Sequence, residues 1–196
     1  MQRMKFLQGI TAAVLALCAA LAQGADVDRT GGPYVPTPPA VVEAMLKLAN
    51  VGPKDYVIDL GSGDGRIVLQ AATQFKAGGL GVDIDPELVD RANAAARKLG
   101  VADRVQFRVQ DVLRADISRA TVMTLYLLPG MMSSLQKKLL AELKPGTRIV
   151  SHDFTFDKWK PDRTITVETQ EKYDMTGSWT SDVHLWIVPG PTQSAK

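Results

Sequence analysis

Short apolar runs alternate along the chain with stretches in which apolar residues recur every three or four positions. The runs are too short for helices and predict buried strands, whereas the recurring spacing predicts amphipathic helices. This alternation is typical of an α/β fold with a mostly parallel sheet. Helices are expected over residues 37–49, 67–75, 86–99 and 131–143, and strands over 56–58, 80–84, 105–109, 121–128 and 147–151. Two further alternating runs, 164–167 and 183–188, predict a C-terminal antiparallel hairpin.

The first predicted strand ends in Asp-Leu-Gly-Ser-Gly-Asp-Gly-Arg, residues 59–66. Glycines at alternate positions between a strand and a helix let a ligand lie against the main chain. A dinucleotide fingerprint would need a third glycine where the chain has Arg66, and a phosphate-binding loop would need Gly-Lys-Ser or Gly-Lys-Thr. The spacing therefore disfavours a nicotinamide-dependent oxidoreductase.

Two carboxylates accompany this glycine turn. Asp59 ends the strand, and a negative charge there would repel a pyrophosphate but attract a cationic ligand. Asp83 follows the next strand about twenty residues after the glycines, where a βαβ unit places the carboxylate that binds a ribose. A plain turn residue and a helix cap are the alternative roles of these two side chains.

The turn and Asp83 together resemble the first motifs of the class I, seven-strand S-adenosylmethionine-dependent methyltransferases. The resemblance implies a Rossmann-like, doubly wound sheet that carries the antiparallel hairpin at one edge. It also implies cofactor-binding roles, which fall on Asp59, Gly61, Ser62, Gly63 and Asp83 around the methionine and ribose moieties, and on Asp111 with the backbone of Val112 at the adenine. Asp111 can alternatively be an ordinary loop residue.

Three further segments resemble the small protein-lysine methyltransferases related to those acting on adenine nucleotide translocase and the ATP synthase c-subunit. They are Tyr-Val-Pro-Thr-Pro at 34–38, Tyr-Leu-Leu-Pro at 126–129 and the run at 145–152. The resemblance implies a protein lysine as methyl acceptor. Tyr34 and Thr37 are then expected to cover the cofactor, although a linker is the alternative, and Tyr126 is expected to position the acceptor unless it only packs in the core. A catalytically silent domain that binds S-adenosylmethionine or a related nucleoside is the second functional hypothesis.

The remaining polar residues add little chemistry. Ser151, His152 and Asp153 are triad residue types, but consecutive strand residues point to opposite faces and are not expected to form a relay. His152 is expected to border the acceptor pocket, and His184 to lie at the surface or in the hairpin. Neither histidine belongs to a metal-ligand cluster, so no metal is expected.

The N-terminus predicts export. Arg3 and Lys5 precede the apolar run 10–21, and small residues near position 22 fit a cleavage site, so residues 1–22 are interpreted as a signal peptide. An uncleaved membrane anchor is the alternative, and only in that case is membrane association expected. Residues 23–55 then form an N-terminal loop and helix, and residues 56–190 the methyltransferase domain.

Cleavage also changes the charge of the chain. It would leave 21 basic and 21 acidic side chains, because the segment carries two of the 23 basic residues. Nucleic-acid binders usually carry a basic excess, so a nucleic-acid substrate is disfavoured.

Overall fold

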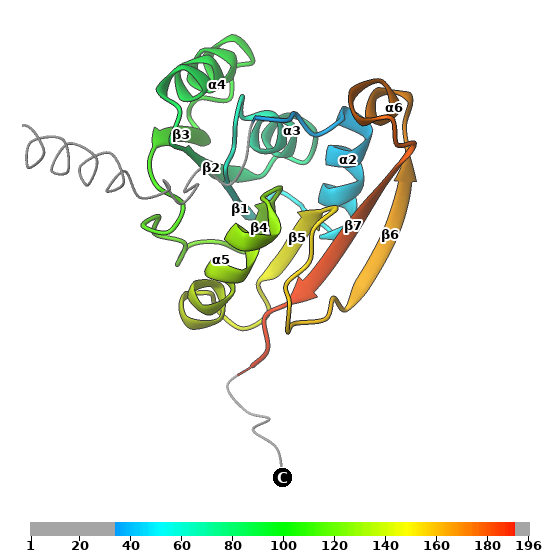
Figure 1. Cartoon of the computed structure of the whole chain (residues 1–196). Helices are drawn as coiled ribbons and strands as arrows, with labels where there is room; N and C mark the ends of the chain where they lie inside the picture. Colours follow the sequence, from blue (N-terminus) through cyan, green and yellow to red (C-terminus); the bar gives the residue numbers. More distant parts are fainter. Residues whose placement is uncertain (1–33, 191–196) are drawn as a thin grey trace, which may run out of the picture.

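The computed structural model describes residues 34–190 and shows one seven-stranded sheet with helices on both faces (Figure 1). The strand order is β3-β2-β1-β4-β5-β7-β6. The strands are β1 Tyr56–Leu60, β2 Gly78–Asp83, β3 Val105–Val109, β4 Val122–Leu125, β5 Arg148–His152, β6 Arg163–Glu168 and β7 Thr180–Ile187. The first five strands in the chain run parallel, whereas β7 pairs antiparallel with both β5 and β6. The predicted α/β class with a C-terminal antiparallel pair is confirmed.

The predicted signal peptide, and the part of the N-terminal loop that precedes residue 34, lie outside the described residues. Within residues 34–190, none of the helices combines the length and the hydrophobicity that a bilayer crossing requires.

Alternation along the central strands divides the core into two layers. Val57 of β1 and Val122 of β4 face one side, while Ile58 and Met123 face the other. The helices are α2 Pro39–Leu48, α3 Arg66–Gln74, α4 Pro86–Lys98, α5 Pro129–Glu142 and α6 Gln170–Thr176. Helices α2, α3 and α4 cover the first side, and α5 covers the second with three fully buried side chains, Met132, Leu135 and Leu139. Strands buried on both faces explain the nearly continuous apolar runs of the sequence.

The connection between β6 and β7 differs from the sequence prediction. The two strands pair as expected, but the seven-residue helix α6 is inserted between them instead of a simple turn. The side chain of Thr169 accepts a hydrogen bond from the N–H of Lys172 at 3.0 Å, and Gly177 ends the helix with φ 75°. These are an ordinary helix start and stop, placed close together. In Figure 1 the helix lies at the same end of the sheet as the carboxyl end of β5.

Candidate active site

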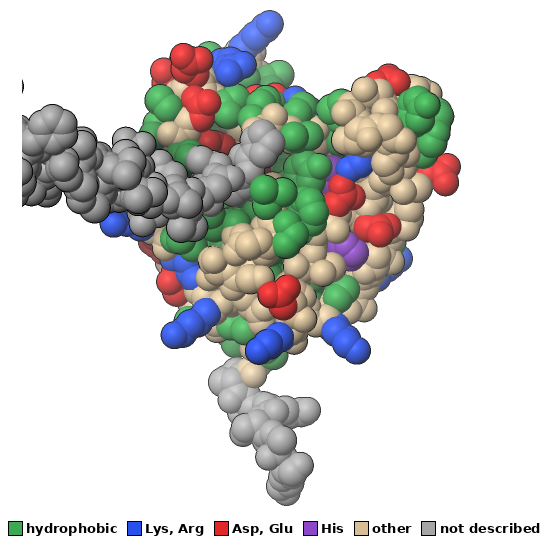
Figure 2. Space-filling model, viewed as in Figure 1, with side chains coloured by type: hydrophobic (Ala, Val, Ile, Leu, Met, Phe, Trp, Pro, Cys, Tyr) green, Lys and Arg blue, Asp and Glu red, His purple; other side chains and the backbone are tan. Residues whose placement is uncertain are grey.

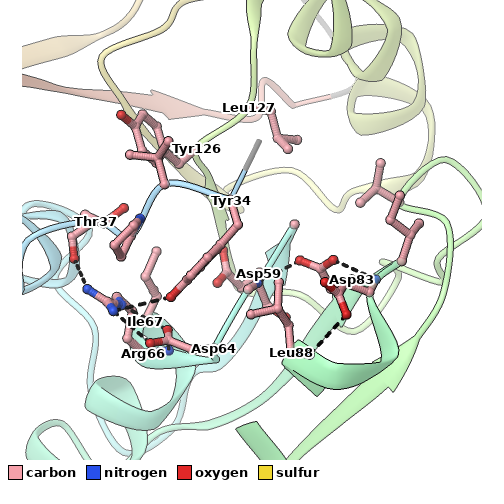
Figure 3. A pocket seen from close by; sticks show the side chains of 18 of the residues that line it. Tyr34, Thr37, Asp59, Asp64, Arg66, Ile67, Asp83, Leu88, Tyr126 and Leu127 are labelled. Carbon is pink, nitrogen blue, oxygen red and sulfur yellow. Dashed lines mark hydrogen bonds and ion pairs between the residues drawn. The ribbon is translucent and has the colours of Figure 1, made fainter. Parts of the chain in front are cut away.

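A cavity of about 460 Å³ opens at the carboxyl ends of β1, β2 and β4, where doubly wound sheets bind their ligands (Figure 3). It is lined by all ten residues that were predicted to bind the cofactor or position the acceptor: Tyr34, Thr37, Asp59, Gly61, Ser62, Gly63, Asp83, Asp111, Val112 and Tyr126. The fold therefore brings these residues together from five separate segments. Their individual roles stay predictions.

The glycine turn forms the floor of the cavity. Gly61 and Gly63 have φ values of 78° and 53°, a region that favours glycine, and the N–H groups of Gly61 and Ser62 donate to the carbonyl oxygen of Val82. A Cβ on Gly61 would lie 2.8 Å from Leu127, and one on Gly63 would lie 2.5 Å from the ring of Tyr34. Only a bare main chain fits here, so a ligand can approach the backbone closely.

Asp83 lies beside this floor. Its two carboxylate oxygens accept hydrogen bonds from the N–H of Gly63 at 2.8 Å and from the N–H of Asp85 at 3.0 Å. Each oxygen keeps a free lone pair, because a carboxylate oxygen can accept two hydrogen bonds. Asp83 is thus fixed at the cavity wall and can still accept bonds from two hydroxyl groups.

Asp59 is the most deeply buried carboxylate of the cavity, with 2% of its surface exposed. Burial raises the pKa of Asp59, and the nearby charge of Asp83 adds to this effect. A 2.7 Å hydrogen bond from Thr124 acts in the opposite direction, and the resulting pKa is about 7. A carboxylate in this position ionises readily only when a positive charge lies next to it. This environment matches the expected attraction of Asp59 for a cationic ligand.

Residues 34–37, which we call the N-terminal strap, cross the cavity and are tied to the glycine turn by Arg66. The Arg66 guanidinium donates to the carbonyl oxygen of Thr37 at 2.9 Å and to the hydroxyl of Tyr34 at 3.4 Å, and it forms an ion pair with Asp64 at 2.7 Å. Burial opposes ionisation of Asp64, but the bonds from Arg66 lower its pKa overall. The sequence does not predict this contact, because Asp64 and Arg66 by themselves do not indicate a partner about 30 positions away.

Tyr126 lies on the opposite wall, within a stack of rings. Its ring centroid is 3.9 Å from that of His152 and 6.1 Å from that of Phe154. Burial raises the pKa of the Tyr126 hydroxyl. The mouth of the cavity carries four exposed apolar side chains, Tyr34, Val35, Ile84 and Leu128. Figure 2 shows hydrophobic side chains gathered over the middle of this face.

His152 lies behind Tyr126 and does not line the cavity itself. It is fully buried, with its ring nitrogens 3.2 Å from the Thr37 hydroxyl and 2.8 Å from the Ser181 hydroxyl. Burial lowers its pKa to about 4, so the ring is neutral at physiological pH. The His152 ring therefore contacts Thr37 of the N-terminal strap, the ring of Tyr126 and Ser181 of β7.

Within the described residues Ser151, His152 and Asp153 form no relay, although His152 and Asp153 approach each other, and His184 lies in the C-terminal hairpin but not at the surface. His152 Nε2 lies 3.5 Å from the carboxylate of Asp153, because a φ of 61° at Asp153 turns the chain out of the strand geometry. Ser151 stays outside this contact and donates to the carbonyl oxygen of Phe154. His184 is only 7% exposed and lies 2.9 Å from the hydroxyl of Thr164, since neighbouring segments cover its face of β7.

The chemistry of the cavity fits a cationic nucleoside-like cofactor. Ser62 is 6% exposed, and its hydroxyl oxygen has no hydrogen-bond partner among the described residues. The lining has five carboxylates, Asp59, Asp64, Asp83, Asp85 and Asp111, and one basic side chain, Arg66. Within residues 34–190 no group of side chains has the composition of a metal site.

Comparison with known proteins places these observations in a family. Residues 59–163 match the model of the ANTKMT methyltransferase domain. A protein-lysine N-methyltransferase of Saccharolobus islandicus (strain REY15A) is 42% identical over 157 residues, which cover 80% of this chain and 93% of that protein. The lysine N-methyltransferase of Xenopus laevis that is named for the ATP synthase c-subunit is 36% identical over 146 residues, covering 73% of this chain but only 63% of its own length.

A solved structure agrees with this assignment. The crystal structure of an RNA methyltransferase from Salinibacter ruber, in complex with S-adenosyl-L-homocysteine, is 46% identical with a TM-score of 0.72 and covers 82% of this chain and 98% of its own. The cofactor is therefore S-adenosylmethionine, and the catalytically silent alternative is not favoured. The chain belongs to the ANTKMT methyltransferase domain family and is an S-adenosylmethionine-dependent methyltransferase.

Proposed function

We propose that the protein methylates the side-chain amine of lysine in a protein acceptor. The observation that carries the proposal is the similarity to a protein-lysine N-methyltransferase over 93% of that relative's length. The surplus of carboxylates in the cavity supports it, because both the cofactor and a lysine side chain bring positive charge.

The residues of the site divide into two groups in this reaction. When bound, S-adenosylmethionine supplies a methyl group activated by the sulfonium next to it. Asp83 would accept hydrogen bonds from its ribose hydroxyls, Asp59 would hold its positively charged methionine moiety, and Asp111 with the backbone of Val112 would contact the adenine. Tyr126, on the opposite wall, positions the acceptor amine, and much of the rate enhancement comes from holding the two reactants in line.

RNA is the second candidate acceptor, because the 46% identical protein from Salinibacter ruber is described as an RNA methyltransferase. The charge of the chain argues against it. The full sequence has a net charge of only +2, and the cavity lining is acidic. A nucleic-acid substrate would meet repulsion at the point where the methyl group is transferred.

The test is incubation of the protein with methyl-tritiated S-adenosylmethionine and a cell extract, split into a nuclease-treated and a protease-treated half. We expect label in the nuclease-treated half only, and methyllysine after acid hydrolysis of the labelled protein. The variant Asp83→Asn, assayed in parallel, identifies label that does not depend on the cavity. Label that survives protease treatment and disappears after nuclease treatment would show that the methyl acceptor is RNA and not a protein lysine. Label in neither half would contradict the proposed acceptor.

We also propose that the protein acts outside the cytoplasm after removal of residues 1–22. The proposal rests on the basic residues Arg3 and Lys5, the apolar run at 10–21 and the small residues near position 22. Expression of the full chain in a bacterium, followed by mass spectrometry of the periplasmic protein, should show a mass that lacks these residues. An intact chain in the membrane fraction would support an anchor, and an intact chain in the cytosol would contradict export.

A further inference from the structure

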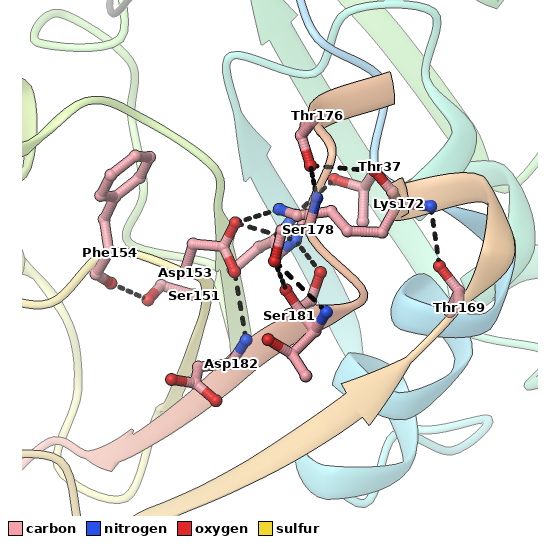
Figure 4. Close-up of polar contacts among 12 residues, drawn as sticks. Thr37, Ser151, Asp153, Phe154, Thr169, Lys172, Thr176, Ser178, Ser181 and Asp182 are labelled. Carbon is pink, nitrogen blue, oxygen red and sulfur yellow. Dashed lines mark hydrogen bonds and ion pairs between the residues drawn. The ribbon is translucent and has the colours of Figure 1, made fainter. Parts of the chain in front are cut away.

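Lys172 has an unusual position for a lysine. It is the third residue of α6, and only 5% of its surface is exposed. Figure 4 shows its side chain running inward from α6 to Asp153. Because a lysine side chain normally keeps its ammonium group in water, its burial here needs a specific partner and suggests a specific use.

The partner is Asp153, at the point where the chain leaves β5. The Lys172 ammonium forms an ion pair with one carboxylate oxygen of Asp153, and the other oxygen accepts the N–H of Asp182 at 3.1 Å. Asp153 adopts a φ of 61°, which is uncommon for a residue other than glycine. A buried ion pair often stabilises a protein no more than apolar residues of the same size. Stability alone is therefore a weak reason for this arrangement.

The ion pair lies against Tyr126. The Lys172 ammonium is 5.9 Å from the centre of the Tyr126 ring, and its positive charge lowers the pKa of the Tyr126 hydroxyl against the larger, raising effect of burial. The other titratable groups nearby are His152 on β5 and His184 and Asp182 on β7. His152 is neutral, and Asp182 is exposed and bonded to Thr166. Lys172 and Asp153 thus supply the charges that act on this wall at neutral pH.

We propose that Lys172 is a positioning residue for the acceptor: held in place by Asp153, its ammonium group lies against the Tyr126 ring, and its positive charge makes the bound acceptor ammonium lose its proton more readily. This inference rests on the proposed lysine acceptor. Only the neutral amine has the lone pair that forms the new nitrogen–carbon bond, while the carbon–sulfur bond breaks and its electron pair stays on sulfur. The proton of the acceptor ammonium leaves to solvent before transfer, and a nearby positive charge favours that loss.

The test measures kcat as a function of pH, since kcat reports ionisations within the enzyme–substrate complex. The acceptor is the protein labelled in the extract above, purified and used at saturation. Lys172→Met should move the acid limb of the profile upward by about one pH unit, which is a roughly tenfold lower kcat at neutral pH. Asp153→Asn keeps an oxygen that accepts a hydrogen bond from Lys172 but removes the negative charge that offsets the ammonium. It should therefore move the acid limb to lower pH. Lys172→Arg should leave it in place.

Two controls keep the outcomes distinct. Lys160→Met alters an exposed lysine and should change nothing, while affinity for S-adenosylhomocysteine should stay within threefold of wild type in every variant. A kcat that falls by the same factor at every pH in both Lys172→Met and Asp153→Asn would show a merely structural pair and overturn the inference. A limb that does not move in either variant would overturn it as well. A wild-type protein that produces no methyllysine would instead refute the proposed function itself.

Discussion

Replacing Asp83 by alanine tests the cofactor side of the cavity. The Asp83 carboxylate keeps one free lone pair on each oxygen beside the glycine turn, and these are the predicted acceptors for the ribose hydroxyls. A hydrogen bond to a charged group contributes about 1.5–3 kcal/mol, so the loss of one such bond weakens binding by roughly ten- to a hundredfold. Calorimetric titration with S-adenosylhomocysteine measures this loss directly.

The substitution also removes two bonds to backbone N–H groups, so it needs a matched control. Asp85→Ala is suitable because Asp85 also lines the cavity and also accepts two backbone N–H groups, those of Glu87 and Leu88 at the start of α4. Losing that helix cap costs about 1 kcal/mol of stability. We expect both variants to lower the melting temperature and only Asp83→Ala to lose affinity. Equal losses of affinity in the two variants, or none in Asp83→Ala, would refute the assigned role.

Two further predictions concern pH. Between pH 6 and 8, affinity for S-adenosylhomocysteine should rise as Asp59 ionises near its pKa of about 7, and calorimetry should show a weaker, flatter profile for Asp59→Asn. His152 is neutral in the folded protein down to a pKa of about 4, whereas in the unfolded chain it gains a proton near its ordinary value of 6.5. The unfolded state therefore binds more protons in this window, and stability should fall by about 3 kcal/mol as the pH drops from 6.5 to 4. Urea unfolding of wild type and of His152→Asn measures this, and an unchanged slope in the variant would contradict the assignment.

The cofactor side of the site was predictable because its signals are local. The glycine turn and Asp83 lie within 25 residues, and their spacing alone predicts a strand, a turn, a helix and a second strand. A parallel sheet then brings the carboxyl ends of neighbouring strands to one edge. The structure adds what spacing does not contain, such as the burial that raises the pKa of Asp59.

The acceptor side was less predictable because its contacts are long-range. Arg66 binds the strap 29 positions earlier in the chain, and the Thr37 hydroxyl meets a ring nitrogen of His152 across 115 positions. Alternation on β7 placed His184 on a definite face, but it did not show that other segments cover that face. Lys172 was missed because α6 is shorter than the helices that periodicity detects, although Thr169 and Gly177 flank it with ordinary start and stop signals.

This division implies that binding of the cofactor and transfer of the methyl group are separable. Glu168 and Thr180 are paired across β6 and β7, so residues 169–179 can be replaced by Asn-Gly, which closes a two-residue hairpin turn. The shortened protein lacks Lys172 but keeps every residue that lines the cavity. We expect it to bind S-adenosylhomocysteine within a few fold of wild type and to lose most methyl transfer, as measured with tritiated cofactor. Retained transfer would show that α6 has no part in the reaction, whereas lost binding in a folded protein would show that the two sides of the site depend on each other.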